Sequence, residues 1–144
     1  MYEQEAYERG TAAIVRYEDA MATYGSAMAD VIDGKDHLSE CRARIKGYER
    51  EASMDSRVTK SKADGGPSNA DERKKLSEAI LNANPDYETD QRVMWAQEKD
   101  VAVASELATT SRRDGYLQLA IIQFATALLN PDIKLIQPAG RPEE

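Results

Sequence analysis

The sequence has little sulfur and few imidazole or aromatic side chains. One cysteine, Cys41, and one histidine, His37, stand among 144 residues, so the chain lacks an internal disulfide framework and a histidine cluster for a metal ion. It has one Trp, one Phe and seven Tyr. No stretch approaches the roughly 18 apolar residues of a membrane span, and the opening MYEQEAYERG lacks the features of a secretory signal. These absences predict a soluble, cytoplasmic protein.

Charged residues are abundant instead, and they are unevenly distributed. They make up 31% of the chain, with a net charge of −7. Residues 1–41 carry three basic and nine acidic side chains, residues 42–75 carry ten and six, and residues 76–144 carry six and eleven. An acidic chain with a basic centre is a more specific pattern than an acidic chain alone.

Apolar residues recur every seven positions along residues 2–54, which predicts a long helix. One row is Tyr7, Ile14, Met21 and Met28, and its companion is Tyr17, Tyr24, Val31, Leu38, Ile45 and Ala52. The companion row keeps its phase across Gly34, which favours one continuous helix. Because glycine costs about 1 kcal/mol inside a helix, a break at residues 33–36 is the alternative.

The rest of the chain is divided by helix breakers. Residues 55–68 contain Gly65-Gly66-Pro67 and are predicted to be a linker. A short helix is predicted over residues 69–83, with Ser68 or Asn69 as its N-cap. Asn84 precedes Pro85, the start of a second long helix over residues 85–129. Residues 130–144 are predicted to be a tail.

The second long helix also has a heptad pattern. Its row is Tyr87, Met94, Val101, Ala108, Gly115, Ile122 and Leu129. We therefore predict an all-α protein, a single domain in which two long helices form an antiparallel, coiled-coil-like hairpin. The short third helix would lie near the turn.

The basic centre is the first candidate contact surface. Folding the long helices back would gather its side chains at one end of the hairpin. The predicted nucleic-acid or partner contacts are Arg42, Arg44, Lys46, Arg50, Arg73, Lys74 and Lys75. A basic cluster of this kind can neutralise phosphates, although a solvated surface paired with the interspersed acids is the simpler interpretation.

The last third of the second long helix is apolar on nearly all sides, and such a surface needs a cover. It predicts either self-association into a homo-oligomer or the binding of a partner. The residues assigned to self-association are Leu117, Leu119, Ile121, Ile122, Phe124, Leu128 and Leu129.

The residue pattern predicts no enzyme, no metal site and no cofactor. His37 and Cys41 share a helix face, but the sequence supplies no third group to orient them for nucleophilic catalysis. The carboxylates form no His-Glu-x-x-His or Glu-x-x-His motif. They are interpreted as solvated helix faces.

A family resemblance adds a biological setting. Ser68-Asn69-Ala70-Asp71-Glu72-Arg73-Lys74-Lys75, followed by Asn84-Pro85-Asp86-Tyr87, resembles small helical proteins of tailed phages, over about residues 66–129. Asp71 and Asp86 stand where that family usually has Glu. Those proteins tend to lie among early recombination and replication genes and are largely unassigned in function. The resemblance implies a phage-encoded protein acting in the host cytoplasm.

Three functions follow as hypotheses. The first is a non-catalytic accessory or adaptor protein in DNA recombination or replication, in which the basic cluster touches single-stranded DNA or a DNA-bound phage protein. The second is an acidic inhibitor of a basic host nuclease or defence complex, because acidic helices can mimic phosphate charge. The third is a structural virion or assembly component.

Overall fold

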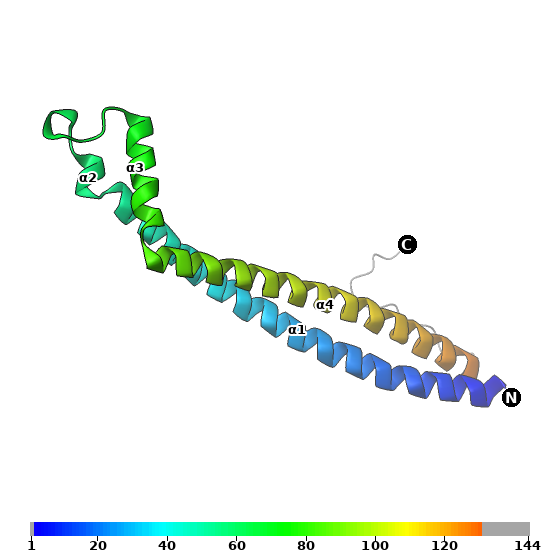
Figure 1. Ribbon diagram of the computed structural model, residues 1–144. Helices are drawn as coiled ribbons and strands as arrows, with labels where there is room; N and C mark the ends of the chain where they lie inside the picture. Colours follow the sequence, from blue (N-terminus) through cyan, green and yellow to red (C-terminus); the bar gives the residue numbers. More distant parts are fainter. Residues whose placement is uncertain (1, 131–144) are drawn as a thin grey trace. The chain divides into compact units, whose positions relative to one another are not determined.

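The computed structural model describes residues 2–130, and every regular element in this part of the chain is a helix (Figure 1). The elements are α1 (Tyr2–Ser53), α2 (Ser56–Thr59), the 3₁₀ helix η1 (Lys62–Asp64), α3 (Ala70–Asn82) and α4 (Pro85–Leu129). The predicted all-α helical hairpin is confirmed. The predicted tail, apart from Asn130, lies outside the described residues.

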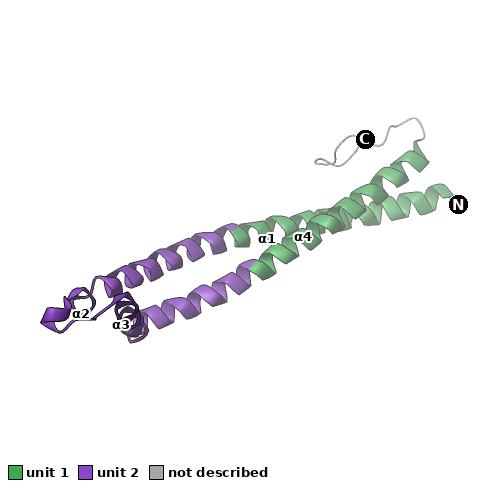
Figure 2. Ribbon diagram, turned by 90° about the horizontal axis from the view of Figure 1, so that it is seen from above, with its two compact units in different colours: residues 1–31, 102–144 green, residues 32–101 purple. Residues whose placement is uncertain are grey.

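The chain divides into two compact units (Figure 2). Among the described residues, unit 1 consists of residues 2–31 and 102–130, and unit 2 consists of residues 32–101. The helix α1 continues through Gly34 without interruption, so the alternative break at residues 33–36 does not occur.

In unit 1, the α1 residues 2–31 lie alongside residues 102–129 of α4 (Figure 2). The buried side chains of α1 are small and recur every seven residues: Ala6, Ala13, Ala20 and Ala27. A Cβ atom placed on Gly10 would lie 3.1 Å from the Cβ atom of Ala125. Because helix spacing depends on the side chains at the contact, this row of alanines lets α1 and α4 approach closely.

One of the two predicted α1 rows was wrong by one residue. Tyr7, Ile14 and Met21 are 65%, 45% and 38% exposed, because the alanine that precedes each of them occupies the contact with α4. The companion row was placed correctly from Val31 onward, since Val31, Leu38, Ile45 and Ala52 are buried. The larger apolar side chain of each adjacent pair was predicted to be buried, but two closely packed helices bury the smaller one.

In unit 2, residues 32–53 of α1 pack against residues 85–101 of α4, and Gly34 marks a close approach. A Cβ atom on Gly34 would collide with the Cγ2 methyl of Val101 and would lie 3.0 Å from the Gln97 amide nitrogen. Tyr87 is buried near the start of α4. Glycine at position 34 is therefore required by packing in spite of its low helix propensity.

The predicted linker contains two short helices. The helix α2 is capped by Asp55, whose carboxylate accepts a hydrogen bond of 2.9 Å from the Arg57 amide. It packs on α3, and its Val58 is buried. The segment after α2 continues through η1, which ends at Gly65 with φ +83°, a conformation that favours glycine.

The helix starts follow the predicted capping residues. The Asn69 side chain accepts a hydrogen bond of 2.9 Å from the Glu72 amide, and Glu72 accepts one of 2.7 Å from the Ser68 amide. Of the two predicted caps for α3, Asn69 is therefore the N-cap. The Asn84 side chain accepts a hydrogen bond of 3.0 Å from the Asp86 amide and starts α4.

Candidate functional site

The basic cluster lies entirely in unit 2, but its members have different environments. The Arg42 guanidinium lies 3.3 Å from a carboxylate oxygen of Glu98, and the Arg44 Nε lies 3.2 Å from Asp90 Oδ2. These two arginines join α1 to α4. Their charges are already matched within the protein, which makes them weaker candidates for a phosphate than the sequence alone suggested.

Asp90 is the centre of a polar node between α1 and α4. Its carboxylate accepts hydrogen bonds from the Tyr48 hydroxyl at 2.8 Å and from Arg44 at 3.2 Å, and its side chain is only 14% exposed. The Tyr48 hydroxyl and the Arg44 guanidinium lower the pKa of Asp90. The hydrogen bond to Asp90 in turn raises the pKa of Tyr48. This node was not predicted from the sequence. Asp90 lies seven residues before Gln97 and therefore on the same face of α4, which is the face toward α1.

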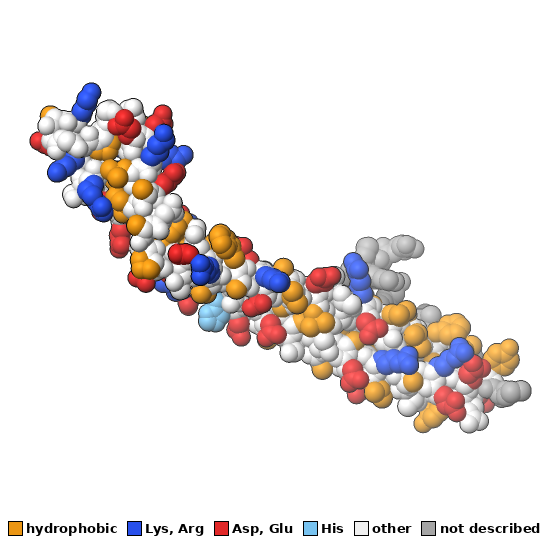
Figure 3. Space-filling model, viewed as in Figure 1, with side chains coloured by type: hydrophobic (Ala, Val, Ile, Leu, Met, Phe, Trp, Pro, Cys, Tyr) orange, Lys and Arg blue, Asp and Glu red, His pale blue; other side chains and the backbone are white. Residues whose placement is uncertain are grey.

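The other basic residues of the cluster are solvent-exposed. They are Lys46, Arg50, Arg73, Lys74 and Lys75. Within residues 2–130, none of these five takes part in an ion pair that the structure records. Figure 3 shows basic side chains spread over the α2 and α3 region, with acidic ones between them. This exposed subset keeps the capacity to bind an anion.

Two members of that subset line a groove of about 630 Å³ in unit 2. Arg73 and Lys74 come from the first half of α3. The groove is completed by the side chains of Glu49, Ser53, Val58, Ser77, Glu78, Leu81 and Tyr87. The guanidinium, the ammonium and the Ser77 hydroxyl are donors that suit a phosphate, while the Ser53 hydroxyl already donates a hydrogen bond of 2.8 Å to the Arg50 carbonyl. The two carboxylates limit the number of phosphates that can enter. We call this the basic groove.

The predicted self-association residues lie in unit 1 and fall on different faces of α4. Leu117, Phe124 and Leu128 are 58%, 63% and 50% exposed. Leu119, Ile121 and Ile122 are half-buried. Ile122 belongs to the heptad row with Ala108 and Gly115, which are buried beside α1. Ile122 therefore contributes to the hairpin, and Leu117, Phe124 and Leu128 remain available for contacts.

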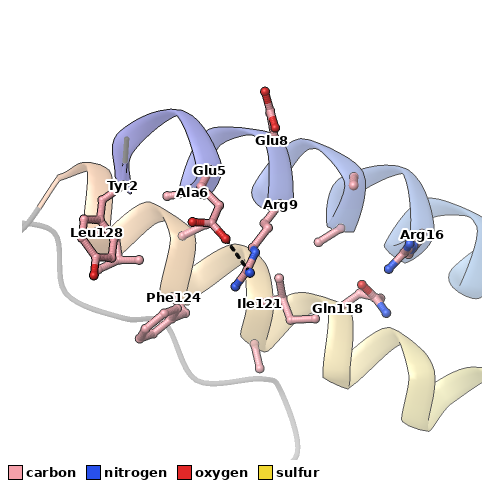
Figure 4. A pocket seen from close by; sticks show the side chains of 14 residues that line it. Tyr2, Glu5, Ala6, Glu8, Arg9, Arg16, Gln118, Ile121, Phe124 and Leu128 are labelled. Carbon is pink, nitrogen blue, oxygen red and sulfur yellow. Dashed lines mark ion pairs between the residues drawn. The ribbon is translucent and has the colours of Figure 1, made fainter.

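An open groove of about 950 Å³ runs between α1 and α4 in unit 1 (Figure 4). Ile121, Phe124 and Leu128 line it from α4, and Tyr2 and Arg9 line it from α1. We call this the apolar groove. Its α1 wall was not predicted, because Glu5, Arg9 and Arg16 are charged and a search for apolar residues at helical spacing does not select them.

One buried polar atom beside the apolar groove, the side-chain oxygen of Gln118, has no hydrogen-bond donor. Gln118 lines the groove and is only 6% exposed. Its amide nitrogen donates a hydrogen bond of 3.3 Å to Asp114, but its buried Oε1 has no donor. Buried acceptors without a donor are unusual.

Cys41 and His37, the two side chains considered for catalysis, differ in their exposure to solvent. Cys41 is 3% exposed and accepts a contact of 3.2 Å from an Arg44 nitrogen, whereas His37 is exposed. Across residues 2–130, no group of three or more His, Cys, Asp or Glu side chains is placed to hold a metal ion. No helix in the same range is both long and apolar enough to cross a membrane.

Comparisons of the chain with protein-family models, curated proteins and solved structures gave no match.

Proposed function

We propose that the protein is a helical adaptor in DNA recombination or replication, which contacts single-stranded DNA or a DNA-bound partner at the basic groove. The observation that carries this proposal is the placement of Arg73 and Lys74 in a groove with the hydroxyl group of Ser77. Exposed cations that lack an internal partner release counterions when they bind phosphates.

The groove's composition favours a short single-stranded contact. Glu49 and Glu78 line it beside the two cations, and the chain as a whole carries a net charge of −7. A long duplex would bring many phosphates close to these carboxylates, and like charges repel. A strand that presents only a few phosphates to the groove avoids most of that repulsion.

The biological setting rests on the phage-protein resemblance of residues 66–129. That stretch includes α3, which supplies the groove's cations. The adaptor role therefore joins a resemblance to early phage proteins with a local arrangement of basic side chains.

The test is fluorescence anisotropy with a labelled single-stranded oligonucleotide at low and moderate salt. Wild-type protein is expected to bind saturably, and its affinity should fall as salt rises. The variant Arg73→Glu/Lys74→Glu/Lys75→Glu should lose binding while its helicity, measured by circular dichroism, stays unchanged.

A matched control separates the groove from net charge. The variant Lys35→Glu/Arg92→Glu/Lys99→Glu makes the same change in net charge at exposed positions of unit 2 outside the groove. It should retain most of the affinity. Equal losses in the two variants, or no wild-type binding at low salt, would remove the nucleic-acid proposal.

The acidic-inhibitor function is the second candidate, and the exposed carboxylates of α1 favour it. Glu3, Glu5, Glu8, Glu18 and Asp19 are all solvent-exposed. On α4, however, Asp90 and Glu98 already pair with arginines of α1, which weakens the acidic face there. This function predicts no binding to the oligonucleotide and a salt-sensitive complex with a basic nucleic-acid-binding protein.

A further inference from the structure

Unit 1 contains a second groove between α1 and α4, and its lining is polar. It has a volume of about 440 Å³ and begins at Arg16, which also lines the apolar groove. The side chains that line it are Arg16, Asp19, Ala20 and Thr23 of α1 and Thr110, Ser111 and Asp114 of α4. We call this the polar groove. Every lining side chain except Ala20 carries a charged or hydroxyl group.

The two carboxylates of the polar groove come from opposite walls at the same level of the helix pair. A Cβ atom placed on Gly115 would lie 3.9 Å from the Ala20 Cβ atom, and Asp114 and Asp19 directly precede these two residues. Neither carboxylate takes part in an ion pair that the structure records within residues 2–130. Asp114 accepts one hydrogen bond of 3.3 Å from the Gln118 amide nitrogen, and a carboxylate has about four lone-pair sites. Both groups can therefore accept further donors.

The threonine hydroxyls of the polar groove differ from the other threonine hydroxyls of the chain. A helical threonine commonly donates its hydroxyl hydrogen to the backbone carbonyl four residues earlier. The threonines that do so are Thr11, Thr59, Thr89, Thr109 and Thr126. The other two, Thr23 and Thr110, line the polar groove, and the structure records no hydrogen bond of their hydroxyls within the described residues. They are available to a ligand.

Ser111 is the buried polar group that points to a ligand. It is only 7% exposed and lines the polar groove, yet no hydrogen bond of its hydroxyl is recorded among residues 2–130. Buried hydroxyl groups normally have a partner. A ligand in the groove would supply one.

The charge of unit 1 favours a cation in the polar groove. Residues 2–31 and 102–130 carry eight acidic and four basic side chains, a net charge of −4. Within the groove, the two carboxylates outnumber the one cation, Arg16. A groove in which one sign of charge predominates raises the local concentration of counter-ions.

The hydrogen-bonding groups indicate an ammonium rather than a metal ion. Mg²⁺ demands a near-ideal octahedral set of oxygen ligands, and across residues 2–130 no group of three or more His, Cys, Asp or Glu side chains is placed to hold a metal ion. A primary ammonium group, as in lysine, has three N–H donors, which can reach acceptors on both walls. Its aliphatic chain can lie against the methyl group of Ala20, the one apolar side chain that lines the groove.

We propose that the polar groove binds a primary alkylammonium group. The ammonium lies between Asp19 and Asp114 and donates one hydrogen bond to each carboxylate and one to the Ser111 hydroxyl. Hydrogen bonds between charged groups are stronger than those between neutral groups. The ammonium belongs either to a free polyamine or to a lysine side chain of a partner protein. This site lies in unit 1 alone, so it does not depend on nucleic-acid binding by unit 2.

The first test titrates the full-length, isotope-labelled protein with n-butylammonium chloride and follows the backbone amide chemical shifts by NMR. Saturable shifts are expected at residues 16–23 and 110–114. Tetramethylammonium chloride is the matched ligand control, because it has the same charge and no N–H donor, and it should bind at least about tenfold more weakly. Equal effects of the two salts, or no saturable shift with n-butylammonium, would overturn the proposal.

Substitutions test the assigned acceptors. Asp19→Asn and Asp114→Asn should each weaken n-butylammonium binding by at least about fivefold, because each removes a charged acceptor. Ser111→Ala should also weaken binding and leave the helicity, measured by circular dichroism, unchanged. Glu18→Gln removes the same charge from an exposed neighbour of Asp19 outside the groove and should bind like wild type. Equal losses in Asp19→Asn and Glu18→Gln would assign the effect to net charge and overturn the site.

Two further ligands distinguish the sources of the ammonium, and both results below support the site. A gain in affinity for spermidine over n-butylammonium that Asp114→Asn abolishes would identify a free polyamine. Equal affinities for n-butylammonium and N-acetyl-lysine methylamide, without that gain, would identify a lysine side chain of a partner. Saturable shifts of the same residues with magnesium chloride but not with n-butylammonium would make the groove a metal site and overturn the proposal.

Discussion

The hydroxyl of Tyr48 donates a hydrogen bond of 2.8 Å to the carboxylate of Asp90, and this contact joins α1 to α4 in unit 2. Arg44, one turn before Tyr48, donates to the same carboxylate oxygen. A polar group between packed helices fixes which residues face each other, because any other register leaves it unpaired. The node therefore sets the register of the two helices near the start of α4.

Replacement of Asp90 by Asn should lower the stability of the protein, and the loss should depend on pH. Tyr48 and Arg44 lower the pKa of Asp90 in the folded state. The carboxylate therefore stabilises the fold above the usual carboxyl range near pH 4, and this contribution disappears as pH falls through the lowered pKa. Thermal unfolding followed by circular dichroism should show a lower melting temperature for Asp90→Asn than for wild type at neutral pH.

The difference should shrink steadily as the solution is acidified. Glu88→Gln is the matched control, because Glu88 is an exposed carboxylate on the same turn whose partner, Arg92, is also exposed. It should have little effect at any pH. A difference between wild type and Asp90→Asn that does not change with pH would contradict the role assigned to the carboxylate charge.

Alanine substitutions at Gly34 and Gly47 should have opposite effects. A Cβ atom at Gly47 meets open space, so Gly47→Ala should stabilise the protein by up to about 1 kcal/mol through helix propensity. At Gly34 the same atom collides with Val101, so Gly34→Ala should destabilise it. Urea unfolding curves of the two variants check this, and a stabilised Gly34→Ala protein would show that the helices are not in close contact there.

The alanine row of α1 should not tolerate larger side chains. Ala27 is 1% exposed, and overpacking a tight site costs about 1–3 kcal/mol, so Ala27→Leu should lower the free energy of unfolding by that amount. Ala22→Leu, at an exposed position of α1, should be nearly neutral. Equal stabilities of the two variants would mean that the row is not at the contact with α4.

The basic residues of the cluster should fall into two groups, one that affects stability and one that affects oligonucleotide binding. Arg44→Ala should lower thermal stability, because it removes a donor to Asp90, while leaving oligonucleotide affinity nearly unchanged. Arg73→Ala/Lys74→Ala should weaken oligonucleotide binding and leave the melting temperature nearly unchanged. The salt dependence of binding should also become shallower in the second variant, because fewer counterions are released. A reversed outcome would assign the contact to Arg44.

Much of the helical structure was predictable, because its signals are local. The heptad spacing and the caps at Asn69 and Asn84 lie within a few residues of what they control. The short helices α2 and η1 were missed, because Gly65, Gly66 and Pro67 dominate the composition around them. The contact role of the basic cluster stays a prediction. The pairing of Arg42 and Arg44 with α4 was not predictable, because their partners are more than 40 residues away in the chain.

The sequence by itself determined that the chain forms two long helices with capped starts and a basic centre, since helix propensity, capping and charge are properties of neighbouring residues. Only the tertiary structure decided which side of each helix is buried. Ala13 and Ile14 are adjacent and both apolar, and the close approach of α4 selects the alanine. The same approach leaves Phe124 and Leu128 uncovered beside a groove, because the side chains that fill a seam depend on the partner helix.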